Sequence, residues 1–174
     1  MEPCAPPSSV ATMKTKLLVA SAVLLALPAW AAEGPVVDGE GLKVRFVTDA
    51  ERAVPGETLR VALFIEHDPE FHTYWRSPGI VGLPTALDWD LPEGAEAGPI
   101  RWPVPIRTKM AQITAWGYEE DTALVTEIRM PADLGGDSVT LRAEATWMCC
   151  ARTCHPGFET VEITLPVGAE SGED

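Results

Sequence analysis

Apolar and polar residues alternate with a period of two along much of the chain. The clearest case is residues 139–147, where every second residue is apolar and the residues between are Thr, Arg or Glu. Successive side chains of a strand point to opposite faces, so this pattern predicts strands buried on one face. Further segments of this kind, or short extended pieces, lie at residues 42–46, 59–65, 71–75, 86–90, 100–102, 124–130 and 161–165.

Short runs rich in Pro and Gly separate these segments and predict turns. They are Val54-Pro-Gly56, Ser77-Pro-Gly79, Leu91-Pro-Glu-Gly94, Gly135-Gly-Asp137 and Pro156-Gly157. No segment repeats apolar residues at helical spacing over a useful length. Many short strands without helices predict an all-β fold, an immunoglobulin-like antiparallel β-sandwich, with a small closed barrel as the alternative. Residues 102–106 contain two prolines and cannot form a central strand.

The N-terminal residues have the pattern of a secretory signal peptide. The basic segment Met13-Lys-Thr-Lys16 precedes an apolar run at residues 17–27, and Pro28-Ala-Trp-Ala-Ala32 supplies the small residues of a cleavage site. We predict a signal peptide over residues 1–31, of which residues 1–12 are an upstream extension. The apolar run is too short to span a bilayer stably, and no later segment qualifies. We therefore expect a periplasmic protein whose mature chain has no membrane span.

Cleavage after Ala31 would leave about 143 residues, an ordinary size for one domain. We expect residues 32–174 to form that single domain, with a short acidic tail at residues 170–174. The chain has 26 acidic and 13 basic residues and a net charge of −13. Such a surface repels phosphate backbones and anionic lipid, which argues against a nucleic-acid partner. The sequence contains no hydrolase motif or phosphate-binding glycine loop, and no cofactor is expected.

Three of the four cysteines lie within six residues, in the run Cys149-Cys150-Ala-Arg-Thr-Cys154-His155. Because one predicted strand ends at Trp147 and the next opens at Phe158, residues 148–157 are predicted to be the connecting loop. Cys150 and Cys154 are close enough for a tight loop to form a disulfide, which persists in an oxidising compartment. A bond between adjacent cysteines would be strained, and the pleat points Cys149 to the other side. We predict a Cys150–Cys154 disulfide and a free Cys149 thiol.

This cluster is compatible with three functions. A structural disulfide is one, although a loop this short stabilises by less than the ~3 kcal/mol expected of a fifteen-residue loop. A redox-active pair is the second, because a short disulfide on a loop is accessible and reducible. A soft-metal site is the third. Its ligands would be Cys149, Cys150, Cys154 and His155, with Met148 as a further candidate, and it would suit Cu(I) or Zn(II).

The sequence contains several short motifs in a fixed order: Phe71-His-Thr-Tyr-Trp-Arg-Ser-Pro-Gly79, Gly82-Leu-Pro84, Leu87-Asp-Trp89, Trp102-Pro103, Trp116-Gly-Tyr118 and Cys150-x3-Cys154-x-Pro156. Together they resemble the N-terminal periplasmic domain of DsbD, in the DsbD/ScsB-like family. The resemblance covers residues 36–167 and implies a sandwich with Cys150 and Cys154 as the redox pair. It also implies a protein-disulfide reductase type of thiol:disulfide oxidoreductase, passing electrons from a thioredoxin-like or membrane donor to periplasmic disulfide proteins.

The resemblance also suggests roles for residues around the pair. Trp116 and Tyr118 fall in a cap segment that shields the cysteines, with ordinary core packing as the alternative. Tyr74 falls where the family places aromatic residues beside the site. His155 either stabilises a thiolate, if protonated, or lies on the surface. The residues alone do not decide which cysteine attacks, whereas the resemblance implies Cys154.

The chain departs from the family pattern in three respects. DsbD has a wider cysteine spacing and acidic cap residues, whereas Gln112-Ile-Thr114 occupy that stretch here, and Cys149 is extra. The chain is also expected to be a stand-alone domain that receives its electrons from a separate protein. The alternative function is a non-catalytic copper-binding or interaction domain with a structural disulfide.

Overall fold

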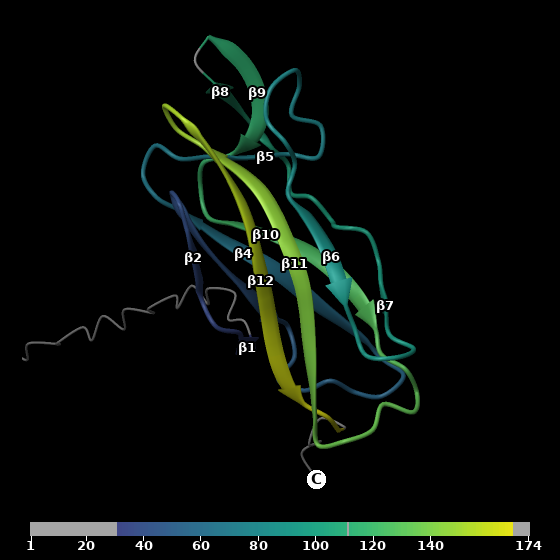
Figure 1. Ribbon diagram of the computed structural model, residues 1–174. Coiled ribbons are helices and arrows are strands. Elements are labelled where there is room, and N and C mark those ends of the chain that lie inside the picture. Colours follow the sequence, from purple (N-terminus) through teal and green to yellow (C-terminus); the bar gives the residue numbers. More distant parts are fainter. Residues whose placement is uncertain (1–30, 111, 169–174) are drawn as a thin grey trace, which may run out of the picture.

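The computed structural model describes residues 31–110 and 112–168, and all regular elements within them are strands (Figure 1). Apart from Ala31, the predicted signal peptide lies outside the described residues, as does the acidic tail. No helix in the described part of the chain could cross a membrane. The strands are β1 (Ala32–Glu33), β2 (Val37–Gly39), β3 (Leu42–Thr48), β4 (Thr58–His67), β5 (Thr73–Tyr74), β6 (Ala86–Asp90), β7 (Glu96–Ala97), β8 (Ile106–Met110), β9 (Ile113–Tyr118), β10 (Thr122–Arg129), β11 (Ser138–Cys150) and β12 (Cys154–Pro166).

The larger sheet has the strand order β1-β3-β4-β10-β7, with β2 paired to β3. Its ladders are antiparallel, and β4 pairs with β10 along eight residues. The predicted alternation is present: Leu42, Val44 and Phe46 of β3 are buried, whereas Lys43 between them is exposed. This sheet therefore turns one continuous apolar face inward.

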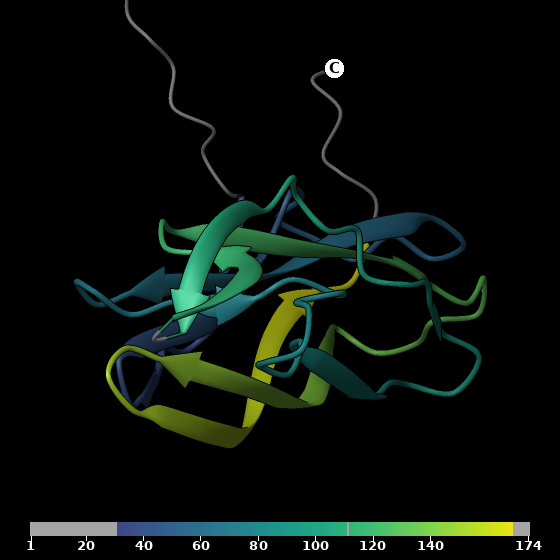
Figure 2. The same ribbon diagram turned by 90° about the horizontal axis from the view of Figure 1, so that it is seen from above.

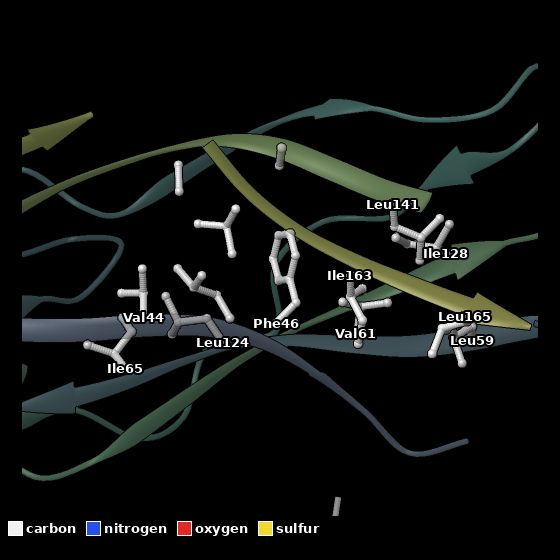
Figure 3. Packing of buried hydrophobic residues seen from close by; sticks show 14 of the residues in the cluster. Val44, Phe46, Leu59, Val61, Ile65, Leu124, Ile128, Leu141, Ile163 and Leu165 are labelled. Carbon is white, nitrogen blue, oxygen red and sulfur yellow. The ribbon is translucent and has the colours of Figure 1, made fainter. Parts of the chain in front are cut away.

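A second sheet, in the order β12-β11-β6, covers that face (Figure 2). Phe46 of the first sheet stacks on Trp89 of β6, with ring centroids 5.0 Å apart. The predicted immunoglobulin-like sandwich is confirmed. Figure 3 shows the core between the layers, which includes Val44, Phe46, Leu59, Val61, Ile65, Leu124, Ile128, Leu141, Ile163 and Leu165.

A small third sheet, in the order β5-β9-β8, stands at one end of the sandwich (Figure 1). We call β8 and β9 the cap hairpin. Gly117 lies so close to β5 that a Cβ atom there would collide with the carbonyl oxygen of Thr73. The backbone amide of Trp116 also donates to the carbonyl of Pro78, 2.9 Å away. These contacts fix the cap hairpin to the segment that leads out of β5.

The structure corrects the prediction that residues 148–157 form a loop. The β11–β12 ladder continues to the Cys150–Cys154 pair, so the connection is only residues 151–153. Pro156 and Gly157 therefore lie inside β12. That strand is at a sheet edge, where the missing proline donor is tolerated. The Trp147 ring covers Gly157, where a side chain would collide with it.

Residues 100–102 were also predicted to be extended, and they form no strand. A single bridge joins Arg101 to Val125 at this point. The following prolines, Pro103 and Pro105, lack the amide donors that a longer ladder would need. The predicted strand at residues 71–75 is likewise shorter in the structure, where β5 contains Thr73 and Tyr74 alone.

Candidate functional site: the disulfide and its cap

The predicted disulfide between Cys150 and Cys154 is present at the tip of the β11–β12 hairpin. Cys150 is the last residue of β11 and Cys154 the first of β12, with Cα atoms 4.1 Å apart. The connection is compact because the amide of Ala151 donates to the carbonyl of Thr153, 3.0 Å away. Two long paired strands thus hold the bond at one end of the molecule.

The two cysteines of the disulfide differ sharply in exposure. Cys150 is fully buried, whereas Cys154 is exposed. The backbone of Cys150 is held by two hydrogen bonds to His72: its amide donates at 3.0 Å, and its carbonyl accepts at 2.9 Å. One cysteine of the pair is therefore fixed inside the protein, and the other lies at the surface.

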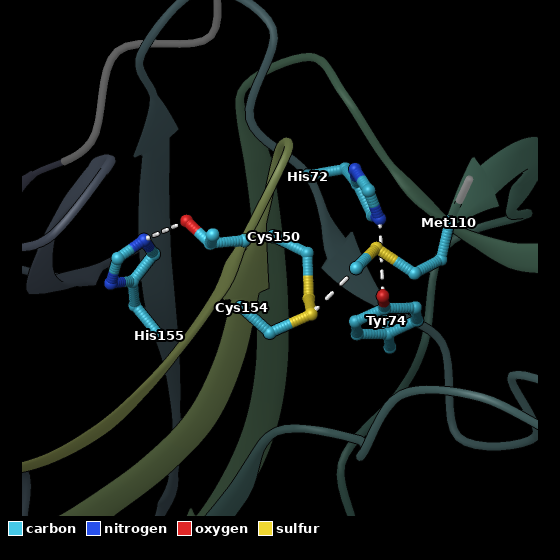
Figure 4. The surroundings of a disulfide bond; sticks show 7 residues. His72, Tyr74, Met110, Cys150, Cys154 and His155 are labelled. Atoms are coloured by element: carbon cyan, nitrogen blue, oxygen red, sulfur yellow. Dashed lines mark hydrogen bonds between the residues drawn. A yellow bond between two sulfur atoms is a disulfide. The ribbon is translucent and has the colours of Figure 1, made fainter.

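The cap hairpin contacts the disulfide through Met110 (Figure 4). The Sδ atom of Met110 lies 3.8 Å from the Sγ atom of Cys154. Because a disulfide sulfur carries no proton, this is a packing contact between two polarisable atoms. Tyr74, Ala115 and Cys150 form a small buried cluster beneath it, against which Val81, Met110 and Met148 pack. Sequence analysis placed Tyr74 beside the site and missed Met110.

Tyr74 is linked to His72 on the buried side of the site. The His72 Nε2 atom and the Tyr74 hydroxyl are hydrogen-bonded at 3.2 Å (Figure 4). Burial raises the pKa of Tyr74 and lowers the pKa of His72, so both groups are neutral near pH 7. The surroundings of Cys150 are therefore apolar or neutral.

Trp116 and Tyr118 lie on the same strand as Ala115 but are differently placed. Trp116 is 43% exposed and pairs in register with Arg107, on the face opposite to that of Ala115. Tyr118 is buried in the main core, and its hydroxyl donates to the carbonyl of Pro103 at 2.8 Å. Burial raises the pKa of Tyr118 to about 12. Their shielding role stays a prediction, and the contact with Cys154 comes from Met110.

Cys149 and His155 lie on the other side of the hairpin. They pair directly in the ladder, one residue away from the disulfide, so the pleat turns them away from it. His155 is hydrogen-bonded through Nε2 to the Thr153 hydroxyl at 2.9 Å, as Figure 4 shows. Cys149 is a buried free thiol 3.7 Å from the carbonyl oxygen of Gly41. Burial raises its pKa to about 12, which makes it unreactive at neutral pH.

The structure does not bring together the four predicted metal ligands. Cys150 and Cys154 lie on one side of the hairpin, and Cys149 and His155 on the other. Among the described residues, no group of three or more His, Cys, Asp or Glu side chains is arranged to hold a metal ion.

Comparisons with known proteins agree with this geometry. Residues 43–166 match the family described as "Thiol:disulfide interchange protein DsbD, N-terminal". The fold is similar to the N-terminal periplasmic domain of ScsB from Proteus mirabilis, with a TM-score of 0.58 and 20% identity. That match covers 78% of this chain and 51% of the ScsB chain, so this chain spans about half its length. None of the curated proteins matches the chain by sequence.

Proposed function

The chain belongs to the family of N-terminal DsbD domains, and on that premise we propose that it is a periplasmic thiol:disulfide exchange module. In this role, the Cys150–Cys154 pair accepts electrons from a thioredoxin-like or membrane donor and passes them to periplasmic disulfide proteins. Family membership and the disulfide fit thiol:disulfide exchange in general. The direction of electron flow and the identity of both partners are our proposal.

The unequal exposure of the two cysteine residues supports this function most directly. An exchange reaction needs one sulfur that a partner can reach and a second that resolves the mixed disulfide. Cys154 is exposed, whereas Cys150 is fully buried and held by its backbone to His72. We therefore assign Cys154 as the attacking thiol and Cys150 as the resolving thiol.

The electrons balance over two exchange steps. The Cys154 thiolate attacks one sulfur of the partner's disulfide, and the other partner sulfur leaves as a thiolate that takes a proton from water. Cys150 then loses its proton and attacks the Cys154 sulfur, which restores the Cys150–Cys154 bond and releases the partner's second thiol. The partner gains two electrons. The 4.1 Å separation of the Cα atoms keeps the resolving sulfur within reach throughout.

The cap hairpin limits which molecules reach the pair. Met110 covers one side of Cys154, and Ala115 and Tyr74 pack against Cys150. In our proposal a partner must displace Met110 to align with the sulfur that it attacks. Trp116 and Tyr118 lie on β9, the strand that carries Ala115. We propose that they shield the pair indirectly, by supporting the cap hairpin.

Two observations support the periplasmic location that we propose. The N-terminal sequence has the pattern of a signal peptide, and the similar ScsB structure is described as a periplasmic domain. An oxidising compartment keeps an idle pair as a disulfide, so a reducing partner must reopen it for each cycle.

The decisive experiment measures the reduction potential of the purified protein in glutathione and dithiothreitol buffers, with thiol trapping read by mass spectrometry. We expect a reversible couple between about −180 and −270 mV, the range of known exchange proteins. A brief pulse of a bulky alkylating reagent should then modify Cys154 before Cys150.

Cys149→Ser is the matched control and should keep the same potential, because the buried Cys149 thiol lies on the other side of the hairpin. A potential below about −300 mV would identify a structural disulfide and contradict the proposal. So would a bond that opens only on unfolding.

A further inference from the structure

Sulfur atoms from two hairpins converge at the disulfide. Cys150 and Cys154 come from β11 and β12, and Met110 comes from the cap hairpin. Met148 packs in the same small cluster. We propose that the reduced protein binds one soft monovalent cation, Cu(I), through Cys150, Cys154 and Met110, with Met148 as a fourth ligand.

The strand pleat selects this set of ligands. Residues two apart on a strand share a face, so Met148 lies on the same side of β11 as Cys150. Cys154 is directly opposite Cys150 in the ladder. Cys149 and His155 also face each other in the ladder, one position away and on the other side of the strands. The site therefore differs from the one that the sequence predicted. Cys149 and His155 are excluded, Met110 is added, and Met148, a further candidate in the sequence, stays a ligand.

The spacing of the sulfur atoms fits a shared metal. Two sulfur ligands each bound at about 2.3 Å around a tetrahedral centre lie roughly 3.8 Å apart. The Cys154 and Met110 sulfur atoms are already 3.8 Å apart in the oxidised protein. Reduction removes the Cys150–Cys154 bond, and the two freed sulfurs need to separate by a similar distance to hold the ion.

The chemistry of the ligands selects the cation. Thiolate and thioether sulfur are soft ligands that favour Cu(I), whereas Mg²⁺ and Ca²⁺ require oxygen ligands. The nearby Nε2 atom of His72 is engaged by the Tyr74 hydroxyl, so the ligand set is sulfur alone. Tyr74, Ala115 and Val81 provide a largely apolar surround on the Cys150 side of the ion.

Binding leaves the oxidation state of the metal unchanged. A dithiol reductant first donates two electrons to the Cys150–Cys154 disulfide and is itself oxidised to a disulfide. Cys150 and Cys154 are then two free thiols. Each thiol then releases its proton as Cu(I) binds. Thiolates that hold the metal cannot attack a disulfide, so metal binding and exchange exclude one another. The inference shares with the proposed function only the requirement that the disulfide can be reduced in the folded protein.

The test uses the purified protein reduced with a phosphine under exclusion of oxygen. Thiol trapping of a sample first verifies that Cys150 and Cys154 are free. Cu(I) is then titrated against a chromophoric Cu(I) chelator, and sulfur ligands are counted by X-ray absorption at the copper edge. We expect one equivalent bound by three or four sulfur atoms. Bound Cu(I) should also block alkylation of Cys154.

Variants separate this site from the predicted one. Met110→Leu keeps the volume of the side chain but removes the thioether. Loss of a residue that only supports a metal ligand already lowers metal affinity roughly 10-fold, so loss of this ligand should weaken Cu(I) binding by at least that factor. Met148→Leu should weaken it less. Cys149→Ser and His155→Ala are the matched controls and should bind like the wild type, because both residues lie on the other face.

The possible results distinguish the two proposals. Free thiols that bind no Cu(I) would overturn the metal site and leave the exchange function standing. Nitrogen ligands in the absorption spectrum would also overturn the metal site alone. Wild-type Cu(I) affinity in the combined Met110→Leu and Met148→Leu variant would have the same meaning. Thiols that cannot be freed without unfolding would overturn both proposals.

Discussion

The two ends of the β11–β12 hairpin have contrasting surroundings. At the end that carries Val139 and Leu165, the hairpin packs into the large core shared by both layers. At the end that carries Cys150, the buried cluster contains only Tyr74 and Ala115 besides the cysteine among the described residues, with partly buried side chains around it. One continuous ladder joins the two ends.

This contrast separates folding stability from reactivity. The main core extends along β11 as far as Cys149 and stabilises the fold through apolar burial. Cys150 at the tip belongs only to the small separate cluster, so local opening of the tip disrupts little of the main core. A disulfide in the main core would open only with the sandwich, whereas one at the hairpin tip can be exchanged while the fold persists.

The largest effect is expected from damage to the sandwich end. Leu141 is fully buried on β11, and Leu141→Ala should lower the free energy of unfolding by about 2–5 kcal/mol. Leu141→Met, the volume-conserving control, should cost less than about 1.5 kcal/mol. Urea denaturation measures both. The reduction potential of the folded Leu141→Ala protein should match that of the wild type, and a shifted potential would show that the two ends are coupled.

A smaller stability effect, with complete loss of exchange, is expected at the tip. Only three residues separate Cys150 from Cys154, so the disulfide constrains little of the unfolded chain. Replacing both cysteines with Ala should lower the free energy of unfolding by less than about 3 kcal/mol. Circular dichroism should show an intact β fold, and an insulin-reduction assay should show no activity. Unfolding of this variant would mean that the disulfide holds the sandwich together.

The smallest effect concerns Cys149 at alkaline pH. Burial raises the pKa of its thiol from an ordinary value of 9.0 to about 12, so the folded state holds a proton that the unfolded state releases. Stability from this group is complete below pH 9 and decreases as pH rises toward 12, by at most about 1.4 kcal/mol per pH unit.

Urea denaturation of wild type and Cys149→Ala between pH 8 and 11 tests this expectation. The difference in stability between the two proteins should change over that range in favour of Cys149→Ala. Tyr118→Phe can be compared in the same experiment, because burial also raises the pKa of Tyr118 to about 12. Its stability relative to the wild type should change with pH in the same direction. Parallel pH profiles for wild type and Cys149→Ala would mean that the thiol is not shielded from solvent.

The sequence predicted the sandwich strands well because their two faces differ strongly in polarity. On β11, Thr, Arg and Glu alternate with buried apolar residues, and the pattern leaves one register. The cap hairpin lacks this contrast. Thr108 is buried on β8 while Ile106 is exposed, so its pattern does not indicate a strand. The prediction of a turn at Pro156-Gly157 was wrong for another reason, because these residues are tolerated within the edge strand β12.

At the site, local relationships were predictable and distant ones were not. The Cys150–Cys154 pairing and the orientation of Cys149 to the opposite face of β11 follow from spacing and from the strand pleat. The contact between Met110 and Cys154 joins residues 44 positions apart. It depends on how the cap hairpin folds over the sandwich, and no local pattern specifies that.

The length of β12 has a practical consequence for experiments on surfaces. β12 contains thirteen residues, from the exposed Cys154 to Pro166, and Figure 1 shows the two ends of this strand at opposite poles of the molecule. At about 3.3 Å per residue, the strand spans roughly 40 Å. A linker attached beyond Pro166 would anchor the protein to a bead or sensor chip with its disulfide directed into solution. Every anchored molecule would then offer the same reactive pole to passing proteins.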